Sequence, residues 1–468
     1  MPAAAYCRAA VTALGPRLVV AGTHSGVGKT TVATGLVAAL RAAGHRPATA
    51  KVGPDFIDPG YHALASGRPP RNLDAWLCGE DAVARLAARA AAGADLLVVE
   101  GVMGLFDGAA DRRASSTADV ARLLGAPVVL VVDAGAMSGS VAAVVHGFAT
   151  LDPRTRVAGV ILNRVGSDGH ETQLREALAP LGIPVLGALR RDDRLIWRDR
   201  HLGLVPVAER PAEVGRALAA LGAAVRERVD LGAVLALGSL APARDGVGPV
   251  PLPEPGPPVR VAVAGGAAFT FTYADTVDAL AAGGAEVVPF DPLHDPALPE
   301  AVDGLLVGGG FPETYAADLA ANRPLLDDAA ARVGTGLATW AECGGLLWLA
   351  DELDGHRLAG AVPATGRMTD RLTLGYRTAT TRVPSPVGPA GTTLRGHEFH
   401  YSRLDPGGEA LDLVGRFGRG REGFATPRLL ATYLHHHPGG DPAAVAAFLA
   451  TCRRRRPAAA GDRPPGTP

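Results

Sequence analysis

The chain has 468 residues, of which 47% are hydrophobic and 20% charged, as is typical of a globular protein with two or three domains. The formal net charge of −1 gives no overall field that would recruit nucleic acid or an anionic membrane. We see no signal-peptide pattern and no uninterrupted apolar run of about 18 residues, so we expect no membrane-spanning helix. Four cysteines without paired spacing disfavour a disulfide framework or a zinc site and favour a cytoplasmic protein.

Apolar, β-branched segments alternate with alanine-rich helical segments through the first half of the chain. Buried strands that alternate with helices predict a parallel α/β sheet. A helix is predicted over residues 30–43. The predicted strands are residues 17–21, 96–99, 128–132, 160–162 and 185–189.

A glycine-rich loop, GTHSGVGKT from Gly22 to Thr30, joins the first predicted strand to this helix. Strand, glycine loop, Lys-Thr and helix form the P-loop arrangement. There, backbone N–H groups hold phosphate, the lysine reaches the terminal phosphates and the threonine binds Mg²⁺. The spacing is similar to the variant loop of dethiobiotin synthetase-like and partitioning-type ATPases, but His24 stands where the partitioning branch has its signature lysine. The predicted ATP-binding residues are Thr23, Ser25, Gly26, Gly28, Lys29, Thr30 and Thr31.

Only two of the 46 Lys and Arg residues are lysines, Lys29 and Lys51. A lysine that persists in so arginine-rich a chain indicates a place where the planar guanidinium does not fit. Lys51 is therefore a second candidate for phosphate chemistry. The alternative is that Lys51 is a chance survivor.

Carboxylates follow the predicted strand ends near Lys51 and residue 99. Asp55 and Asp58 come after Lys51, and Glu100 opens the segment EGVMGLFDG, which contains Asp107. The carboxyl ends of parallel strands meet at the edge where open α/β sheets bind ligands. Each loop alone could be a turn with capping carboxylates, but their convergence predicts a Mg²⁺ site. The predicted metal ligands are Thr30, Asp55 and Glu100.

A Pro/Gly-rich stretch without periodicity, residues 241–258, predicts a linker before a second α/β pattern. We expect a β-rich region from about Leu372, a helix over 442–451 and a disordered tail. The predicted strands are 260–264, 287–290, 304–307, 337–340, 373–378, 393–401 and 429–434. The expected divisions are an extension 1–16, a first domain 17–240, the linker 241–258, a second domain 259–452 and a tail 453–468.

Cys343 lies in the segment AECGG, between a predicted strand and a predicted helix. A sharp turn at two glycines would expose the thiol at a helix N-terminus, where we expect the helix dipole to lower its pKa. The triple glycine Gly308–Gly310 after another strand suits an oxyanion hole. Taken alone, a cysteine in such a context is more often buried and inert than reactive.

Three histidines end a late predicted strand in the segment YLHHH. Alternation puts His435 and His437 on one face and His436 on the other, so a regular strand could not direct all three to one metal. We predict that His435 is the base for Cys343, and His437 could orient it.

Together these motifs resemble the cobyrinic acid a,c-diamide synthase family, from Arg17 to about Ala450. The resemblance rests on GTHSGVGKT, KVGPDFIDPGYH, RNLD, EGVMGLFDG, GGGFPE, AECGG, LGYR and YLHHH in this order. It implies a dethiobiotin synthetase-like ATPase domain followed by a class I (triad) glutamine amidotransferase domain. The implied activity is amidation of the a and c carboxylates of the corrin ring in cobalamin biosynthesis, with glutamine and MgATP as cosubstrates.

By the same resemblance, Cys343 is the nucleophile and His435 its base. Ordinary class I amidotransferases carry a glutamate where this chain has His437. Lys51, Asp55, Asp58 and Asp107 match catalytic positions of the acyl-transfer site. Ammonia must then reach an acyl phosphate before water does. Arginines that could hold substrate carboxylates are Arg190, Arg191, Arg194, Arg198 and Arg200, with a solvated charged loop as the alternative.

Two other functions remain open from the sequence. One is a related amidoligase, either cobyric acid synthase or a nickel-tetrapyrrole a,c-diamide synthase. The other is a partitioning-type ATPase switch, in which Cys343 would be idle. The motifs do not distinguish cobyrinate from metal-free hydrogenobyrinate, and the resemblance is compatible with a homodimer.

Overall fold

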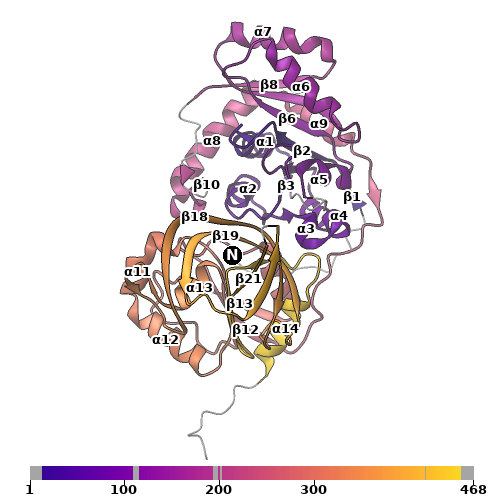
Figure 1. The fold of residues 1–468 in the computed structure, drawn as a ribbon. Coiled ribbons are helices and arrows are strands. Elements are labelled where there is room, and N and C mark those ends of the chain that lie inside the picture. Colours follow the sequence, from indigo (N-terminus) through magenta and orange to yellow (C-terminus); the bar gives the residue numbers. More distant parts are fainter. Residues whose placement is uncertain (1–12, 109–114, 193–198, 201–202, 417, 455–468) are drawn as a thin grey trace, which may run out of the picture. The chain divides into compact units, whose positions relative to one another are not determined.

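A computed structural model describes residues 13–108, 115–192, 199–200, 203–416 and 418–454 (Figure 1). The chain divides into two compact units, Met1–Val250 and Pro251–Pro468. Within the described part of the chain, no helix is both long enough and apolar enough to cross a membrane.

The first unit is built on a seven-stranded sheet in the order β4-β3-β5-β2-β6-β7-β8. Neighbouring strands pair in parallel, and their residues are almost all buried, as the near-continuous apolar runs require. This confirms the predicted parallel α/β architecture. The strands are β2 (Arg17–Gly22), β3 (Pro47–Val52), β4 (Asn72–Leu73), β5 (Leu96–Glu100), β6 (Val128–Asp133), β7 (Val157–Val165) and β8 (Val185–Arg190).

Helices cover this sheet and connect its strands (Figure 1). They are α1 (Lys29–Ala42), α2 (Asp58–Ser66), α3 (Ala75–Cys78), α4 (Glu80–Ala91), α5 (Thr117–Leu124), α6 (Ser140–Thr150), α7 (Asp168–Leu178), α8 (Pro211–Arg228) and α9 (Leu231–Ser239). Strand β5 lies between β3 and β2, with Glu100 in register with Lys51 on one side and Val20 on the other. The loops that leave these three strands therefore start from one point of the sheet edge.

A fully buried arginine anchors both ends of the first unit. Arg17 donates to the carbonyl oxygens of Leu124 at 2.7 Å, Gly15 at 2.7 Å and Pro242 at 2.8 Å. Burial, with nearby Arg244, lowers the pKa of Arg17 to about 10. The short strands β1 (Ala13–Leu14) and β11 (Arg244–Asp245) pair here, so parts of the expected extension and linker belong to the folded unit.

The second unit contains a six-stranded sheet in the order β13-β12-β14-β15-β23-β22, parallel except for β22. Its strands are β12 (Val259–Ala264), β13 (Ala285–Phe290), β14 (Gly304–Val307), β15 (Ala338–Glu342), β22 (Phe424–Thr426) and β23 (Leu429–Thr432). The helices around it are α10 (Ala274–Ala282), α11 (Ala316–Ala321), α12 (Arg323–Gly334), α13 (Gly344–Leu349) and α14 (Ala443–Arg453).

A second, seven-stranded sheet completes this unit. Its strands are β16 (Ala350–Leu353), β17 (His356–Arg357), β18 (Val362–Thr381), β19 (Thr393–Asp405), β20 (Leu411–Gly415), β21 (Gly418–Glu422) and β24 (His435–His436). The β-rich region therefore begins at Ala350, earlier than the predicted Leu372. The sequence did not predict the early part of β18 because it is largely polar and is interrupted by a bulge between Met368 and Thr373. Pairing with β19 holds this segment as a strand although its residues have a weak intrinsic preference for strand.

The strand predicted over residues 429–434 is wrong as a single element. Strand β23 ends at Thr432 in the first sheet, and β24 begins at His435 in the second. Buried Glu422 holds the crossing, because it accepts hydrogen bonds from the Thr432 hydroxyl and from the N–H of Tyr433 at 3.0 Å.

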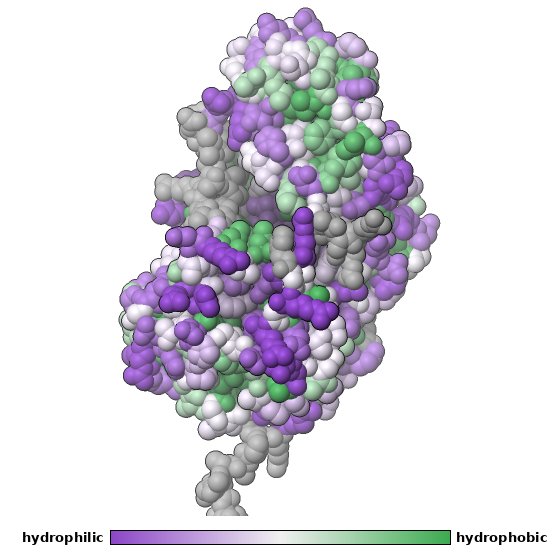
Figure 2. Space-filling view, in the orientation of Figure 1, coloured by the Kyte–Doolittle hydropathy of each residue, from purple (hydrophilic) through white to green (hydrophobic). Residues whose placement is uncertain are grey.

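Large exposed apolar side chains are spread over both units. They are Leu64, Met103, Leu151, Leu240, Leu372, Leu374, Val383 and Val414. On the face drawn in Figure 2, hydrophobic residues form small areas among hydrophilic ones. Such scattered exposure is ordinary for a protein surface.

Candidate active site

The P-loop leaves β2 and enters α1 through a turn that requires glycine. Gly26 and Gly28 have φ angles of 79° and 95°, in the region where side chains are disfavoured. A Cβ on Gly22 would lie 2.4 Å from Val27 Cγ1. The loop from Thr23 to Gly26 is half-buried or exposed, so its backbone can approach a phosphate.

Lys29 supplies positive charge at the start of α1. Its Nζ donates to the carbonyl oxygen of His24 at 3.1 Å. Burial, with the nearby Lys51, lowers the pKa of Lys29 to about 8. A bound phosphate would raise this pKa again and stabilise the charged ammonium. Of the other predicted ATP-binding residues, Thr23 and Thr31 are half-buried and Ser25 is exposed.

Lys51 lies among three carboxylates. Its Nζ is 2.7 Å from Asp58 Oδ2, 2.8 Å from Glu100 Oε1 and 3.9 Å from Asp55 Oδ2. The hydroxyl of Thr30 donates to Glu100 Oε1 at 2.7 Å and lies 3.2 Å from Asp58 Oδ2. We call Thr30, Lys51, Asp55, Asp58 and Glu100 the lysine–carboxylate cluster. The structure thus brings together residues from three strand ends.

The lysine–carboxylate cluster contains more negative than positive charge. Burial alone would lower the pKa of Lys51, but Asp58 and Glu100 raise it above its ordinary value. Burial alone would raise the pKa of Glu100, but Lys51 and His62 hold it well below its usual range. Burial, with Asp55, raises the pKa of Asp58. One ammonium is shared by three carboxylates, so a further cation would be attracted here.

The donor atoms fit Mg²⁺, which prefers hard oxygen ligands. Thr30, Asp58 and Glu100 direct oxygen atoms toward one another, whereas Asp55 Oδ1 accepts from the N–H groups of Ile57 and Asp58. Asp58 is therefore better placed than Asp55 to bind the ion. Among the described residues, no three His, Cys, Asp or Glu side chains form a ready metal cage. Mg²⁺ bound largely through phosphates and water needs no such cage.

His62 is a functional candidate that the sequence analysis did not single out. Its Nε2 lies 2.6 Å from Glu100 Oε2, and each side chain is only 1% exposed. Asp58 and His62 are four residues apart on α2 and so share one helix face. This spacing is the signal that could have indicated His62. A histidine in this position would orient Glu100 if that carboxylate binds a metal ion.

Asp107 organises the loop that follows β5. Its Oδ2 accepts from the N–H of Gly104 at 2.9 Å. The N–H of Leu105 donates to the carbonyl oxygen of Gly22 at 2.9 Å, which ties this loop to the P-loop. Asp107 also acts to raise the pKa of Lys29, against the effect of burial.

The arginines proposed to bind substrate carboxylates are only partly described. Arg190 forms ion pairs with Asp168 and, at 3.2 Å, with Glu171. Its charge therefore serves a contact within the unit, while Arg191 is exposed. Arg194, Arg198 and the side chain of Arg200 lie outside the described residues.

Cys343 occupies a strained turn between β15 and α13. Its φ of 49° and ψ of −100° place a non-glycine residue in a disfavoured backbone region. A Cβ on Gly344 would lie 3.0 Å from Gly310 N, and one on Gly345 would lie 2.3 Å from Val307 O. Close packing thus requires both glycines, and the turn has the geometry of a nucleophile elbow.

The expectation that the helix dipole lowers the pKa of Cys343 is wrong. Burial, with the nearby carboxylate of Glu313, raises the pKa of this thiol above its ordinary value. The following helix has only six residues, and the thiol is almost completely buried. Cys343 therefore rests as a neutral thiol and needs a base.

The glycine loop Gly308–Gly310 lies between the turn at Cys343 and His435. A Cβ on Gly309 would lie 2.4 Å from His435 Cε1, and one on Gly310 would lie 2.0 Å from Ala268 O. Gly344, the residue after Cys343, packs on Gly310 from the other side. The loop backbone therefore lies beside the turn that carries Cys343, as the predicted oxyanion hole requires.

His435 reaches this site because the chain changes sheets. Residue Thr432 pairs with Glu342 in the first sheet, and His435 pairs with His397 in the second, where their rings stack with centroids 4.9 Å apart. Burial, with His400, lowers the pKa of His435 to about 3. The imidazole is therefore neutral and can accept a thiol proton.

The other two histidines of the triplet face different partners. His436 Nδ1 donates to the carbonyl oxygen of Arg395 at 3.0 Å. His437 Nδ1 accepts from the N–H of Gly439 at 3.0 Å, and its Nε2 lies 3.7 Å from Asp275 Oδ2. His437 is thus directed at Asp275.

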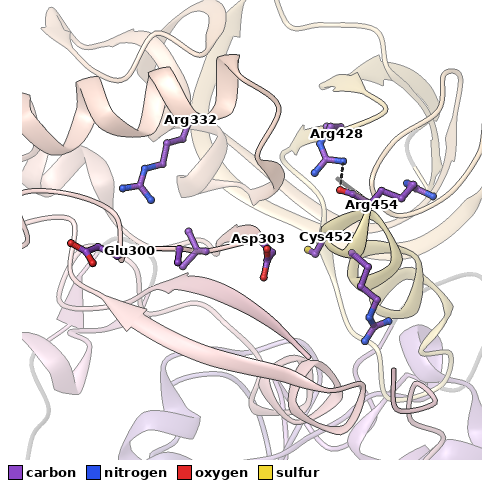
Figure 3. A pocket seen from close by; sticks show the side chains of 9 residues that line it. Glu300, Asp303, Arg332, Arg428, Cys452 and Arg454 are labelled. Atoms are coloured by element: carbon purple, nitrogen blue, oxygen red, sulfur yellow. Dashed lines mark hydrogen bonds between the residues drawn. The ribbon is translucent and has the colours of Figure 1, made fainter. Parts of the chain in front are cut away.

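A cavity of about 560 Å³ in the second unit lies elsewhere (Figure 3). Its lining includes Asp303 and Arg428, which directly precede β14 and β23, so it adjoins the amino ends of the parallel strands. Arg332 donates to the carbonyl oxygens of Leu298 and Pro299, and Arg428 donates to that of Gly336. These arginines satisfy backbone carbonyls, and Cys343 lies at the opposite ends of the strands.

Two family models match the chain, one in each unit. Residues 18–204 match the CobQ/CobB/MinD/ParA nucleotide binding domain. Residues 260–443 match the CobB/CobQ-like glutamine amidotransferase domain. These matches agree with a P-loop in the first unit and a cysteine site in the second.

Curated proteins are similar to the chain over nearly its whole length. Hydrogenobyrinate a,c-diamide synthase of Streptomyces coelicolor is 50% identical over 456 residues, which cover 90% of this chain and 94% of the relative. The protein of the same name from Thermobifida fusca is 47% identical, with coverage of 90% and 93%. Cobyrinate a,c-diamide synthase of Syntrophotalea carbinolica is 45% identical, with coverage of 90% and 95%.

Proposed function

Because the chain belongs to the family of cobyrinate and hydrogenobyrinate a,c-diamide synthases, we propose that it amidates the a and c carboxylates of a corrin ring with ATP and glutamine. The observation that carries this proposal is the 50% identity to a hydrogenobyrinate a,c-diamide synthase over 94% of that relative. We assign the ATP-dependent step to residues 17–240 and the release of ammonia to residues 259–452.

In the first step, a ring carboxylate oxygen attacks the γ-phosphorus of ATP, and the bond to the ADP oxygen breaks to leave an acyl phosphate. Lys29 and Lys51 offset the negative charge on the phosphates. Thr30, Asp58 and Glu100 would hold Mg²⁺, which when bound neutralises phosphate charge. Asp107 holds the loop after β5 against the P-loop.

In the second step, His435 takes the thiol proton and the sulfur of Cys343 attacks the amide carbon of glutamine. The backbone of Gly308–Gly310 stabilises the oxyanion. The imidazolium returns the proton to the leaving nitrogen, so that ammonia departs and a thioester remains, which water hydrolyses to glutamate. Ammonia then displaces phosphate from the acyl phosphate and forms the new amide.

We propose hydrogenobyrinate, the metal-free ring, as the substrate. The relatives with 47% and 50% identity carry that name, and the relative named for cobyrinate is 45% identical.

We also propose a cytoplasmic location, which suits free thiols at Cys78, Cys343 and Cys452. A homodimer is proposed from the resemblance alone, and light scattering of the purified protein tests it.

Purified protein is incubated with glutamine, MgATP and either hydrogenobyrinate or cobyrinate, and product masses are recorded over time. The expected result is two successive amidations of hydrogenobyrinate, each with one ATP hydrolysed. Amidation of cobyrinate alone would correct the choice of ring. ATP hydrolysis without amidation of either ring would overturn the proposed function.

A further inference from the structure

A cysteine–histidine site works best when a third group fixes the imidazole tautomer. The resemblance places a glutamate two residues after the base, where this chain has His437. Both ring nitrogens of His437 face other groups, the N–H of Gly439 and the carboxylate of Asp275. The orienting group for His435 is therefore to be sought on another element.

Glu342 is the last residue of β15 and directly precedes the nucleophile. Its Oε2 lies 3.9 Å from His435 Nδ1, and its Oε1 accepts from the N–H of His436 at 3.2 Å. The Glu342 side chain is 11% exposed and that of His435 only 1%. The carboxylate is held where the chain crosses from β23 to β24, because Glu342 is in register with Thr432.

The Nε2 side of the imidazole lies next to the glycine loop Gly308–Gly310. A Cβ on Gly309 would lie 2.4 Å from Cε1 and 3.3 Å from Nε2 of His435. Nδ1 is thus the nitrogen near Glu342, and Nε2 is the nitrogen near the glycine loop that packs on the residue after Cys343. A base requires this arrangement, since a proton on Nδ1 leaves the lone pair of Nε2 to accept.

We propose that Glu342 is the positioning residue of the glutaminase site, where its carboxylate holds the proton on Nδ1 of His435. This inference rests on the proposed function, because it needs Cys343 and His435 to be the glutaminase pair. The separation of 3.9 Å exceeds a hydrogen bond, and catalytic contacts of this length tighten when substrate closes the site. The carboxylate also stabilises the imidazolium that forms when the thiol loses its proton.

The ionisation of Glu342 supplies a distinctive readout. Burial raises the pKa of Glu342 to about 8. Below that pH the protonated carboxyl would donate to Nδ1 and favour the wrong tautomer, so the glutamine-dependent rate rises as the pH increases through about 8. The ionisable groups around the pair are His397, His400 and Glu398 on β19, His436 on β24, Glu313 on the 3-10 turn after β14, and Cys343.

The test compares Glu342→Gln with Asp275→Asn in the full-length protein, with hydrogenobyrinate, MgATP and either glutamine or ammonium chloride. In Glu342→Gln the side-chain carbonyl can still accept from His436, but an amide NH₂ then faces Nδ1. We expect the glutamine-dependent kcat to fall about 100-fold or more, with KM for glutamine within about threefold. Ammonia-dependent amidation should stay within about twofold, and Asp275→Asn should keep the glutamine-dependent rate within about threefold.

A glutamine-dependent kcat of Glu342→Gln within about threefold of wild type would overturn the inference. Loss of that activity in Asp275→Asn alone would also overturn it and assign the role to His437 and Asp275. If Cys343→Ala keeps glutamine-dependent amidation, the glutaminase site itself fails, which is distinct from a failure of Glu342 alone. If Glu342→Gln does not fold, the pH dependence of kcat/KM for glutamine is measured on the wild-type protein instead. A rise of kcat/KM through about pH 8 supports the inference, and a flat profile from about pH 6 to 9 contradicts it.

Discussion

The lysine–carboxylate cluster of the first unit and the cysteine–histidine site of the second differ in the charge state of their buried ionisable groups. Lys51 and Glu100 stay charged because each lies within 2.8 Å of the other. Cys343 and His435 stay neutral because burial raises the pKa of the thiol and lowers that of the imidazole to about 3. Phosphoryl transfer needs standing charge to offset phosphate, whereas thiol attack needs charge only while it proceeds.

The two sites also differ in how the chain assembles them. The lysine–carboxylate cluster lies at the ends of β3 and β5 and on the segments that follow β2 and β3, three strands that are neighbours in one parallel sheet. The second site needs two sheets, since Cys343 follows β15 in one and His435 begins β24 in the other. A site of the first kind follows from strand order, and a site of the second kind depends on a crossing of the chain.

The largest expected effect distinguishes the two sites by comparing amidation with glutamine and amidation with ammonium chloride. Cys343→Ala should reduce glutamine-dependent amidation by about 10⁴-fold or more, because the thiol proposed to form the thioester is removed. Amidation with ammonium chloride should remain at the wild-type rate. Product mass measured with each nitrogen source checks this, and equal loss with both sources would show that the second site does not act only in ammonia release.

A substitution in the first site should affect both nitrogen sources alike. Lys51→Arg should lower the glutamine- and ammonia-dependent rates together by about 10²- to 10³-fold, since the planar guanidinium does not fit a side-chain site that is 3% exposed. The matched control is Arg46→Lys in the exposed pair with Asp95, which should stay within about twofold. Wild-type ammonia-dependent activity in Lys51→Arg would argue against a role of Lys51 in phosphoryl transfer.

A smaller effect tests the metal part of the first site alone. His62→Leu removes the group that lies 2.6 Å from Glu100 Oε2 while keeping similar volume. The Mg²⁺ concentration for half-maximal amidation should rise about 10- to 100-fold. Glutamine hydrolysis at Cys343 should not acquire this Mg²⁺ dependence. Exposed His146→Leu is the control, and an equal shift in that variant would contradict a specific role.

The smallest expected effect concerns stability at the crossing from β23 to β24. Burial raises the pKa of Glu422 to about 7, from an ordinary value of 4.5. The folded state therefore holds a proton that the unfolded chain releases, so this group destabilises the fold progressively from about pH 4.5 to 7. Glu422→Gln should raise Tm at pH 8 by about 5 °C relative to wild type and much less at pH 5.

Thermal unfolding at the two pH values checks this prediction, with exposed Glu286→Gln as the control. An equal change of Tm at both pH values in Glu422→Gln would mean that the carboxyl is not protonated in the folded state.

By itself the sequence determined the parallel α/β architecture and the family. It also predicted the P-loop, a role of the two lysines in phosphate chemistry and the turn at Cys343. These features are contiguous, so strand period, glycine spacing and residue type report them directly. The roles of the individual site residues remain predictions that the substitutions above can test.

Only the tertiary structure placed His62 against Glu100 and Glu342 beside His435. The residue numbers of the partners differ by 38 in the first pair and by 93 in the second. It also divided the stretch that reads as one strand over residues 429–434 and reversed the expected pKa shift of Cys343. The physical reason is the same in each case. Burial and the electric field at a side chain are set by groups from distant parts of the chain, whereas local sequence reports only neighbouring residues.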